Sequence, residues 1–287
     1  MCASMSTARQ ADQAGGRAHL LRPASLLLFV AIVLAVIAGV AWQYGWHGHL
    51  FFQESAADAL AHLESAELML RSGQYSAAQR QIAPVLRDPH GPLYRQARLL
   101  QWRIAKTEAL AIPAGSPRRQ AAMRGLRPQL AALYALGAWP LAQWQAFARD
   151  AFALGAYDLS AQARLAAATV DSQERQADQL AAAHAWAAGN QPAKAGALLL
   201  QLAAQSHDSE RAKHWFLQGI RWVEGGKGAE AALQVAQSTL QKLPQLWQDH
   251  EVVLAMAELA LSADRPQLAA QWLHRELLRN VPSEKRS

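Results

Sequence analysis

Five short turns recur along the chain, and their spacing constrains the fold more strongly than any other feature of the sequence. Each turn consists of a small residue where a helix is expected to end, a short polar stretch, and an alanine inside the next helix. The five turns are the segments 73–78, 155–161, 189–195, 225–231 and 263–269. From the second turn onward, their starts lie 34, 36 and 38 residues apart. Such a period is typical of helical repeat arrays, so we expect an α-solenoid at residues 56–282.

The residues at these turns and the composition around them support this interpretation. A glycine such as Gly73 or Gly155 can adopt the left-handed conformation that ends a helix. Pro192 and Pro266 stand where the first turn of a helix needs no amide donor. Ala, Leu, Gln, Arg and Glu, which favour helices, dominate this part of the chain. The predicted fold class is therefore all-α, with about five or six helical hairpins in the solenoid.

The interval between the first two turns is 82 residues, longer than two ordinary repeats. Segments 93–112 and 118–136 within it have the composition of two longer helices. Ser116 is the expected N-cap of the second helix, and Pro117 its first helical residue. Pro128 lies inside that helix and should kink or split it, because proline lacks the amide that the helix requires. We expect an irregular long hairpin within the array.

An apolar segment precedes the repeats, and the span from Pro23 to Gln53 contains no Asp, Glu, Lys or Arg. A helix rises about 1.5 Å per residue, so roughly twenty residues cross a hydrocarbon core of about 30 Å. Three arginines and one aspartate precede the segment, whereas no Lys or Arg follows it until Arg71. Positive-inside logic then predicts a single-pass inner-membrane protein with a transmembrane helix at 23–44, a cytoplasmic N-terminus and a periplasmic C-terminal domain. A cleaved signal peptide is the alternative.

The segments beside the predicted anchor are short and polar. Residues 1–22 are expected to form a disordered cytoplasmic tail, 45–55 a connector, and 283–287 a C-terminal tail. His47 and His49 in the connector could touch one metal ion, but two ligands do not make a site, and we predict no metal. The only cysteine is Cys2, so the exported domain would be held together by helix packing without an internal disulfide.

The sequence contains no pattern typical of enzymes. Glycine-rich phosphate loops, the H-E-x-x-H metalloprotease motif and the nucleophile elbow of hydrolases are missing from it. The net charge of +6 is dispersed without the basic stripe or motif of nucleic-acid-binding proteins. We therefore expect no catalytic residues, no cofactor and no nucleic-acid partner.

The repeats resemble the tetratricopeptide repeat (TPR), a helix-turn-helix unit with small residues where its helices cross. The first unit carries the resemblance best, through Ala66, Gly73, Tyr75, Ala78 and Pro89. In that family the first helix of each pair lines a groove that takes peptides or partner helices. Counting ten and six residues back from the turn glycines, the resemblance implies four candidate partner-binding residues, namely Gln145, Arg149, Gln179 and Trp215. A column three residues before the glycines, including Phe152 and Trp222, is expected to pack repeat against repeat.

The anchor followed by alanine-rich repeats, with the phrase at residues 263–272, is similar to the periplasmic repeat region of PelB-type exopolysaccharide export proteins. The expected function is that of a membrane-tethered periplasmic scaffold, which binds partner proteins in an envelope complex for exopolysaccharide export or biosynthesis. Two alternatives are an assembly chaperone or quality-control factor for envelope proteins, and a periplasmic glycan-binding protein. The sequence does not specify the partner or the oligomeric state.

Overall fold

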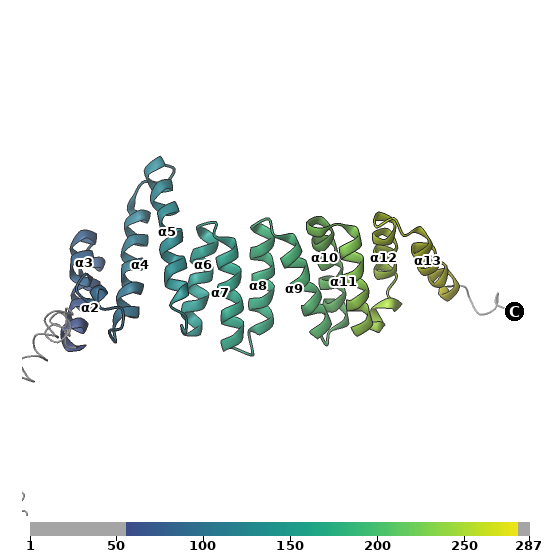
Figure 1. The fold of residues 1–287 in the computed structure, drawn as a ribbon, viewed down its shortest axis with the longest axis horizontal. Helices are drawn as coiled ribbons and strands as arrows, with labels where there is room; N and C mark the ends of the chain where they lie inside the picture. Colours follow the sequence, from purple (N-terminus) through teal and green to yellow (C-terminus); the bar gives the residue numbers. More distant parts are fainter. Residues whose placement is uncertain (1–55, 281–287) are drawn as a thin grey trace, which may run out of the picture. The chain divides into compact units, whose positions relative to one another are not determined.

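The computed structural model describes residues 56–280, which form twelve α-helices, two short 3-10 helices and no strand (Figure 1). Two compact units divide the chain between Asp58 and Ala59, and the second contains almost all of these helices. The predicted tail (1–22), membrane helix (23–44), connector (45–55) and C-terminal tail (283–287) lie outside the described residues. Within 56–280, no helix combines the length and hydropathy needed to span a membrane.

The helices follow one another with short turns. Their bounds are α2 Ala56–Arg71, α3 Tyr75–Ile82, α4 Tyr94–Ala111, α5 Pro117–Ala135, α6 Leu141–Ala153, α7 Tyr157–Val170, α8 Arg175–Ala188, α9 Pro192–Gln205, α10 Ser209–Lys227, α11 Ala229–Lys242, α12 His250–Ser262 and α13 Pro266–Asn280. The 3-10 helices are Val85–Arg87 and Pro244–Gln248. We call α2, α6, α8, α10 and α12 the first helices of their hairpins, because each precedes one of the five predicted turns.

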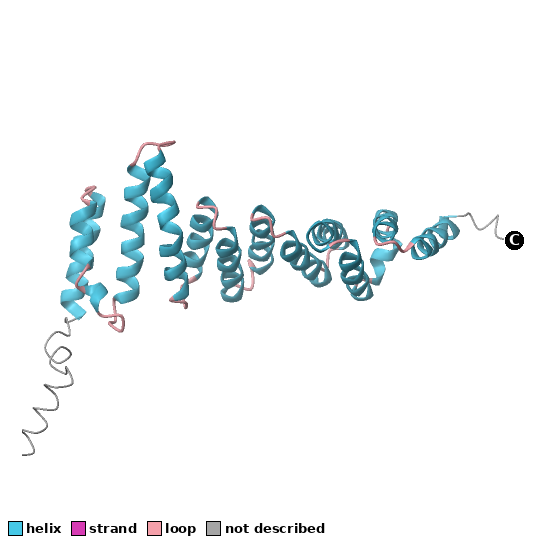
Figure 2. Ribbon diagram, turned by 45° about the horizontal axis from the view of Figure 1, so that its top comes forward, coloured by secondary structure: helices cyan, strands magenta, loops and turns pink. Residues whose placement is uncertain are grey.

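From α3 onward, each helix packs against the helices before and after it in the sequence (Figure 2). In addition, α9 contacts α11 and α10 contacts α12, so that helices in equivalent positions of neighbouring hairpins touch. Contacts that join only near neighbours characterise helical repeat arrays. The all-α prediction is thus confirmed, and the packing of the second unit agrees with a solenoid.

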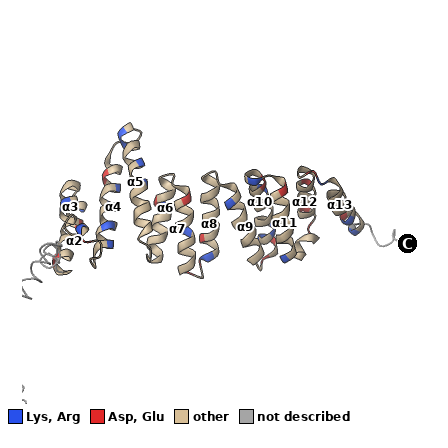
Figure 3. Ribbon diagram, viewed as in Figure 1, with Lys and Arg blue, Asp and Glu red and all other residues tan. Residues whose placement is uncertain are grey.

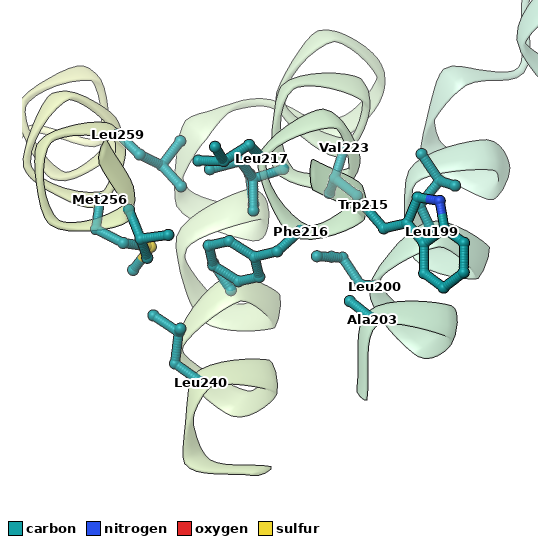
Figure 4. Packing of buried hydrophobic residues seen from close by; sticks show 14 of the residues in the cluster. Leu199, Leu200, Ala203, Trp215, Phe216, Leu217, Val223, Leu240, Met256 and Leu259 are labelled. Carbon is teal, nitrogen blue, oxygen red and sulfur yellow. The ribbon is translucent and has the colours of Figure 1, made fainter. Parts of the chain in front are cut away.

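Buried residues of this unit form three hydrophobic clusters. One joins α2, α3 and α4, the second joins α4 to α7, and the third extends from α7 to α13. In the third cluster Phe216 of α10 is fully buried among Leu200 of α9, Leu240 of α11 and Met256 of α12 (Figure 4). One side chain thus links helices of three successive hairpins, which makes neighbouring repeats depend on each other for burial.

Two glycines allow α9 and α10 to cross closely. A Cβ atom at Gly196 would lie 2.5 Å from the carbonyl oxygen of Gly219, and one at Gly219 would lie 2.9 Å from the Leu200 side chain. Real Cβ contacts are longer, so any larger residue would push the two helices apart. The sequence-based turn pattern contains neither glycine, and this crossing is a finding of the structure.

The predicted turns are placed correctly, but three of the left-handed residues are not the expected ones. Gly73 and Gly155 have φ of +74° and +68°, as predicted. In the third and fifth turns the positive φ falls on Asn190 and Asp264, each one residue after the marker of its turn. The fourth marker was wrong: Gly225 lies inside α10, which continues to Lys227 and ends at Gly228 with φ +84°. Asn tolerates this conformation because its short polar side chain can hydrogen-bond locally.

The long hairpin between the first two turns is confirmed as α4 and α5. Ser116 caps α5 by accepting a hydrogen bond from the Arg119 amide at 3.2 Å, and Pro117 is the first helical residue. Pro128 does not split the helix, contrary to one of the two expected effects, since α5 runs unbroken to Ala135. In a regular helix the Arg124 carbonyl accepts a hydrogen bond from the amide of residue 128, which proline lacks. Arg124 and Pro128 are both exposed. Water can therefore satisfy the carbonyl that the proline leaves unbonded.

Candidate functional site

Two of the predicted partner-binding residues lie one turn apart on α6. The Gln145 side chain is half-buried and donates a hydrogen bond from Nε2 to Glu174 Oε2 at 3.2 Å. Arg149 is exposed on the next turn. No ion pair involving Arg149 is present among residues 56–280, so its guanidinium can meet an external acidic group.

The other two predicted residues are less accessible. Gln179 on α8 is half-buried, and within the described part of the chain its Oε1 atom is shielded from solvent and accepts no hydrogen bond. Trp215 on α10 is 6% exposed and belongs to the third hydrophobic cluster. The guanidinium of Arg211 lies 6.0 Å from the centre of its ring. In this position the Trp215 side chain contributes to the core and offers little surface to a partner.

The observed helix ends account for the burial of Trp215. Gln179 and Trp215 were counted ten residues back from Gly189 and Gly225. The observed left-handed residues are Asn190 and Gly228. A shift of one residue rotates a helix position by about 100°, and a shift of three rotates it by about 300°. Counting six residues back from the observed left-handed residues of the last four turns gives Arg149, His184, Trp222 and Glu258.

These four residues form a row, which we call the first-helix row, with one member on each of α6, α8, α10 and α12. Arg149, His184 and Glu258 are exposed, and Trp222 is partly exposed. The His184 and Trp222 rings lie 5.8 Å apart with an interplanar angle of 85°. This edge-to-face contact is a favoured aromatic geometry. It directly joins two members of the row that lie on neighbouring hairpins.

Around the row, α6 and α8 carry small side chains, whereas α12 carries apolar side chains beside an acidic one. Ala142 on α6 and Ala177 on α8 are exposed alanines. On α12, Leu254 and Leu261 are 39% and 55% exposed beside Glu258. Lys, Arg, Asp and Glu are spread along the helices and do not gather on one of them (Figure 3). The arrangement suits a protein partner that contributes apolar contacts and a few matched charges.

Ion pairs at the repeat spacing hold neighbouring hairpins in position. Four of them join residues 35 or 36 positions apart, and they are Glu67–Arg103, Asp158–Lys194, Lys213–Asp249 and Glu230–Arg265. Burial raises the pKa of the Asp158 carboxyl, but hydrogen bonds from Trp186 and Lys194 outweigh it and lower that pKa below its usual value. Lys213 donates hydrogen bonds to Glu210 and Asp249, and these bonds raise its pKa. Structural pairing explains the shifted pKa values of both groups.

No protein-family model matches this chain, and no curated protein or solved structure is significantly similar to it. The TPR and PelB-type resemblances therefore stay predictions based on the repeat pattern. Within residues 56–280, no group of three His, Cys, Asp or Glu side chains is placed to hold a metal ion. The first-helix row places three exposed side chains and one partly exposed side chain at equivalent positions of four hairpins.

Proposed function

We propose that this chain is a TPR-like scaffold, tethered to the inner membrane, that holds partner proteins of an envelope complex on the periplasmic side. The observation that supports the proposal best is the first-helix row, in which equivalent positions of four successive hairpins present Arg149, His184, Trp222 and Glu258. A row of this kind can contact an extended or helical partner at regular intervals. Such repeated contacts suit binding of a protein chain better than binding of a small molecule, which needs a concave site.

The tether rests on the sequence of residues 23–44. An anchor there would confine the row to the membrane surface and raise its effective concentration toward partners in the same membrane. The PelB-type similarity makes exopolysaccharide export or biosynthesis the pathway in which we look for the partner first. No turnover of a substrate is part of this function.

Charge reversal at the two ends of the row tests the proposal. Arg149→Glu and Glu258→Lys each change an exposed side chain, so neither should disturb folding. Lys242→Glu on α11 is a matched control, because Lys242 is also exposed but lies on a second helix. The full-length chain and each variant would be purified from membranes after crosslinking, and their co-purifying proteins compared.

We expect the wild type and Lys242→Glu to retain one discrete set of envelope proteins. Arg149→Glu and Glu258→Lys should each lose it, because an opposed charge at a docked interface costs affinity. Equal recovery by all four proteins would contradict the use of this surface. Circular dichroism of each purified protein would establish that its helices are intact.

A further inference from the structure

A groove lies where α5 meets the turns of two successive hairpins, and it shares no residue with the first-helix row. Its volume is about 510 Å³, and it is open along one side. The α5 helix contributes Arg127, Pro128 and Ala131, while segments 155–159 and 189–191 contribute the two turns. The irregular long hairpin thus creates a feature that regular repeats alone would not form.

Two glycines leave space for neighbouring side chains at the groove. A Cβ atom at Gly155 would lie 3.0 Å from Nη2 of Arg127, and one at Gly189 would lie 2.7 Å from Cβ of Tyr157. The marker glycine of the third turn, which does not carry the positive φ, therefore has another role. It makes room for Tyr157 at the lining of the groove.

The charges of the groove leave one cation without an acidic partner. Arg127 donates from Nε to the Leu154 carbonyl at 2.7 Å, and among residues 56–280 no carboxylate pairs with its guanidinium. Asp158, in contrast, is already occupied. Its carboxylate accepts hydrogen bonds from three side chains, which are Trp186 at 3.0 Å, Lys194 at 3.1 Å and Gln162 at 2.7 Å.

The remaining lining is mainly apolar and includes Pro128, Ala131, Leu159 and Tyr157, and its one amide side chain is Gln191. A saccharide would require several convergent polar groups that are free to hydrogen-bond, and Asp158 is not free. An apolar floor with one uncompensated guanidinium at its edge fits an apolar side chain next to a carboxylate. Arginine binds carboxylates well because its planar fork can make two parallel hydrogen bonds.

We propose that this groove docks a short extended peptide segment of a partner protein, in which an acidic residue neighbours one or two apolar residues. The apolar side chain rests on Pro128, Ala131 and Leu159, and the carboxylate pairs with Arg127. The site is separate from the first-helix row, so it provides a second point of attachment and does not depend on the function proposed above.

The test uses the purified full-length chain and an array of twelve-residue synthetic peptides. Each peptide carries Leu-Pro-Leu at its centre, followed by Glu, Gln or Lys in otherwise identical glycine–serine surroundings. We expect the Glu peptides to bind about 3- to 10-fold more tightly than the Gln peptides, the range of a partly exposed Arg–carboxylate pair. The Lys peptides should bind most weakly.

Two pairs of variants locate the binding. Arg127→Glu should reverse the preference toward Lys peptides, whereas Arg124→Glu, one turn earlier on α5 and exposed, should leave it unchanged. Ala131→Trp should fill the groove and abolish binding without altering Arg127, and Ala132→Trp, exposed on the same helix, should not. Because Arg127 also bonds Leu154, thermal unfolding of each variant accompanies the binding data.

Three results would overturn the proposal. These are equal binding of the Glu, Gln and Lys peptides, equal effects of the members of each variant pair, and binding of an oligouronate but of no peptide. The last result would assign the groove to an acidic saccharide. The peptide-docking proposal would be supported by loss of binding in Ala131→Trp with retained thermal stability, together with the reversed preference of Arg127→Glu.

Discussion

Lys213 Nζ lies 3.0 Å from Asp249 Oδ2, and the two residues are 36 positions apart, close to one repeat. Asp249 is also the N-cap of α12, where its Oδ1 accepts hydrogen bonds from the amides of Glu251 at 2.9 Å and Val252 at 3.3 Å. One carboxylate therefore both starts a helix and connects it to the first helix of the preceding hairpin. This pair is the clearest example of how local capping and repeat-to-repeat contact coincide in the array.

Removing both functions of Asp249 should cost more than removing its charge alone. Asp249→Ala is expected to lower the free energy of unfolding by about 1–2 kcal/mol, the usual cost of a lost N-cap. Asp249→Asn keeps an oxygen that can accept the amide bonds and loses only the ion pair, so its cost should be smaller. Urea unfolding followed by circular dichroism measures both. Equal costs for the two variants would contradict the capping role.

The lowered carboxyl pKa values predict an acid-sensitive array. Burial raises the pKa of Asp249, but hydrogen bonds from Lys213 and the Val252 amide outweigh it, and the hydrogen bond from Arg103 lowers that of Glu67. A carboxyl with a lowered pKa stabilises the fold fully above its unfolded value of about 4, and the contribution is lost as pH falls through the folded value. The unfolding free energy should therefore be flat near neutrality and fall below about pH 4. Asp249→Asn should flatten this decrease.

The glycine crossing of α9 and α10 predicts a large effect from a single methyl group. Gly196→Ala should destabilise the protein by about 1–3 kcal/mol, because overpacking displaces the Gly219 backbone or Val223. Gly125→Ala is the matched control, since a Cβ atom at this position in α5 meets nothing within 4 Å. It should be neutral or stabilising by up to about 1 kcal/mol. Thermal or urea unfolding of the two variants would distinguish these outcomes.

The corrected end of α10 predicts opposite effects at two neighbouring glycines. Gly228 has φ of +84°, so Gly228→Ala should cost about 1–2 kcal/mol of stability. Gly225 lies inside the helix with open space around its Cβ position, so Gly225→Ala should raise stability by about 0.5–1 kcal/mol. If the helix ended at Gly225 as the sequence pattern suggested, the two signs would be exchanged.

The sequence predicted the helices well because their signals are local. Ser116 followed by Pro117 specified the start of α5, and the period of the turns specified the hairpins. The crossing of Gly196 and Gly219 could not be predicted, since it depends on which faces of two helices meet. Pro128 shows the same limit, because its effect depended on the solvent exposure of a carbonyl one turn away.

The candidate site was predicted only in part, and register was the reason. Gln145 and Arg149 follow from Gly155, which does carry the positive φ. His184 was not selected and Trp222 was assigned to repeat packing, because Asn190 and Gly228 end their helices in place of the marker glycines. The signal was available in the sequence, since Asn and a later glycine are both known to end helices, but choosing among several adjacent candidates requires the packed structure. The groove beside Arg127 could not have been found, because it joins segments far apart in the chain.

Site-specific photo-crosslinking in living cells tests whether the first-helix row holds partner proteins. A photoreactive residue would replace His184 in the first-helix row or, as the control, Gln201, which is exposed on the second helix α9. We expect discrete crosslinked envelope proteins from position 184, reduced by Arg149→Glu, and none from position 201. Identical products from both positions, or products from position 201 alone, would contradict the claim that the first-helix row holds the partners.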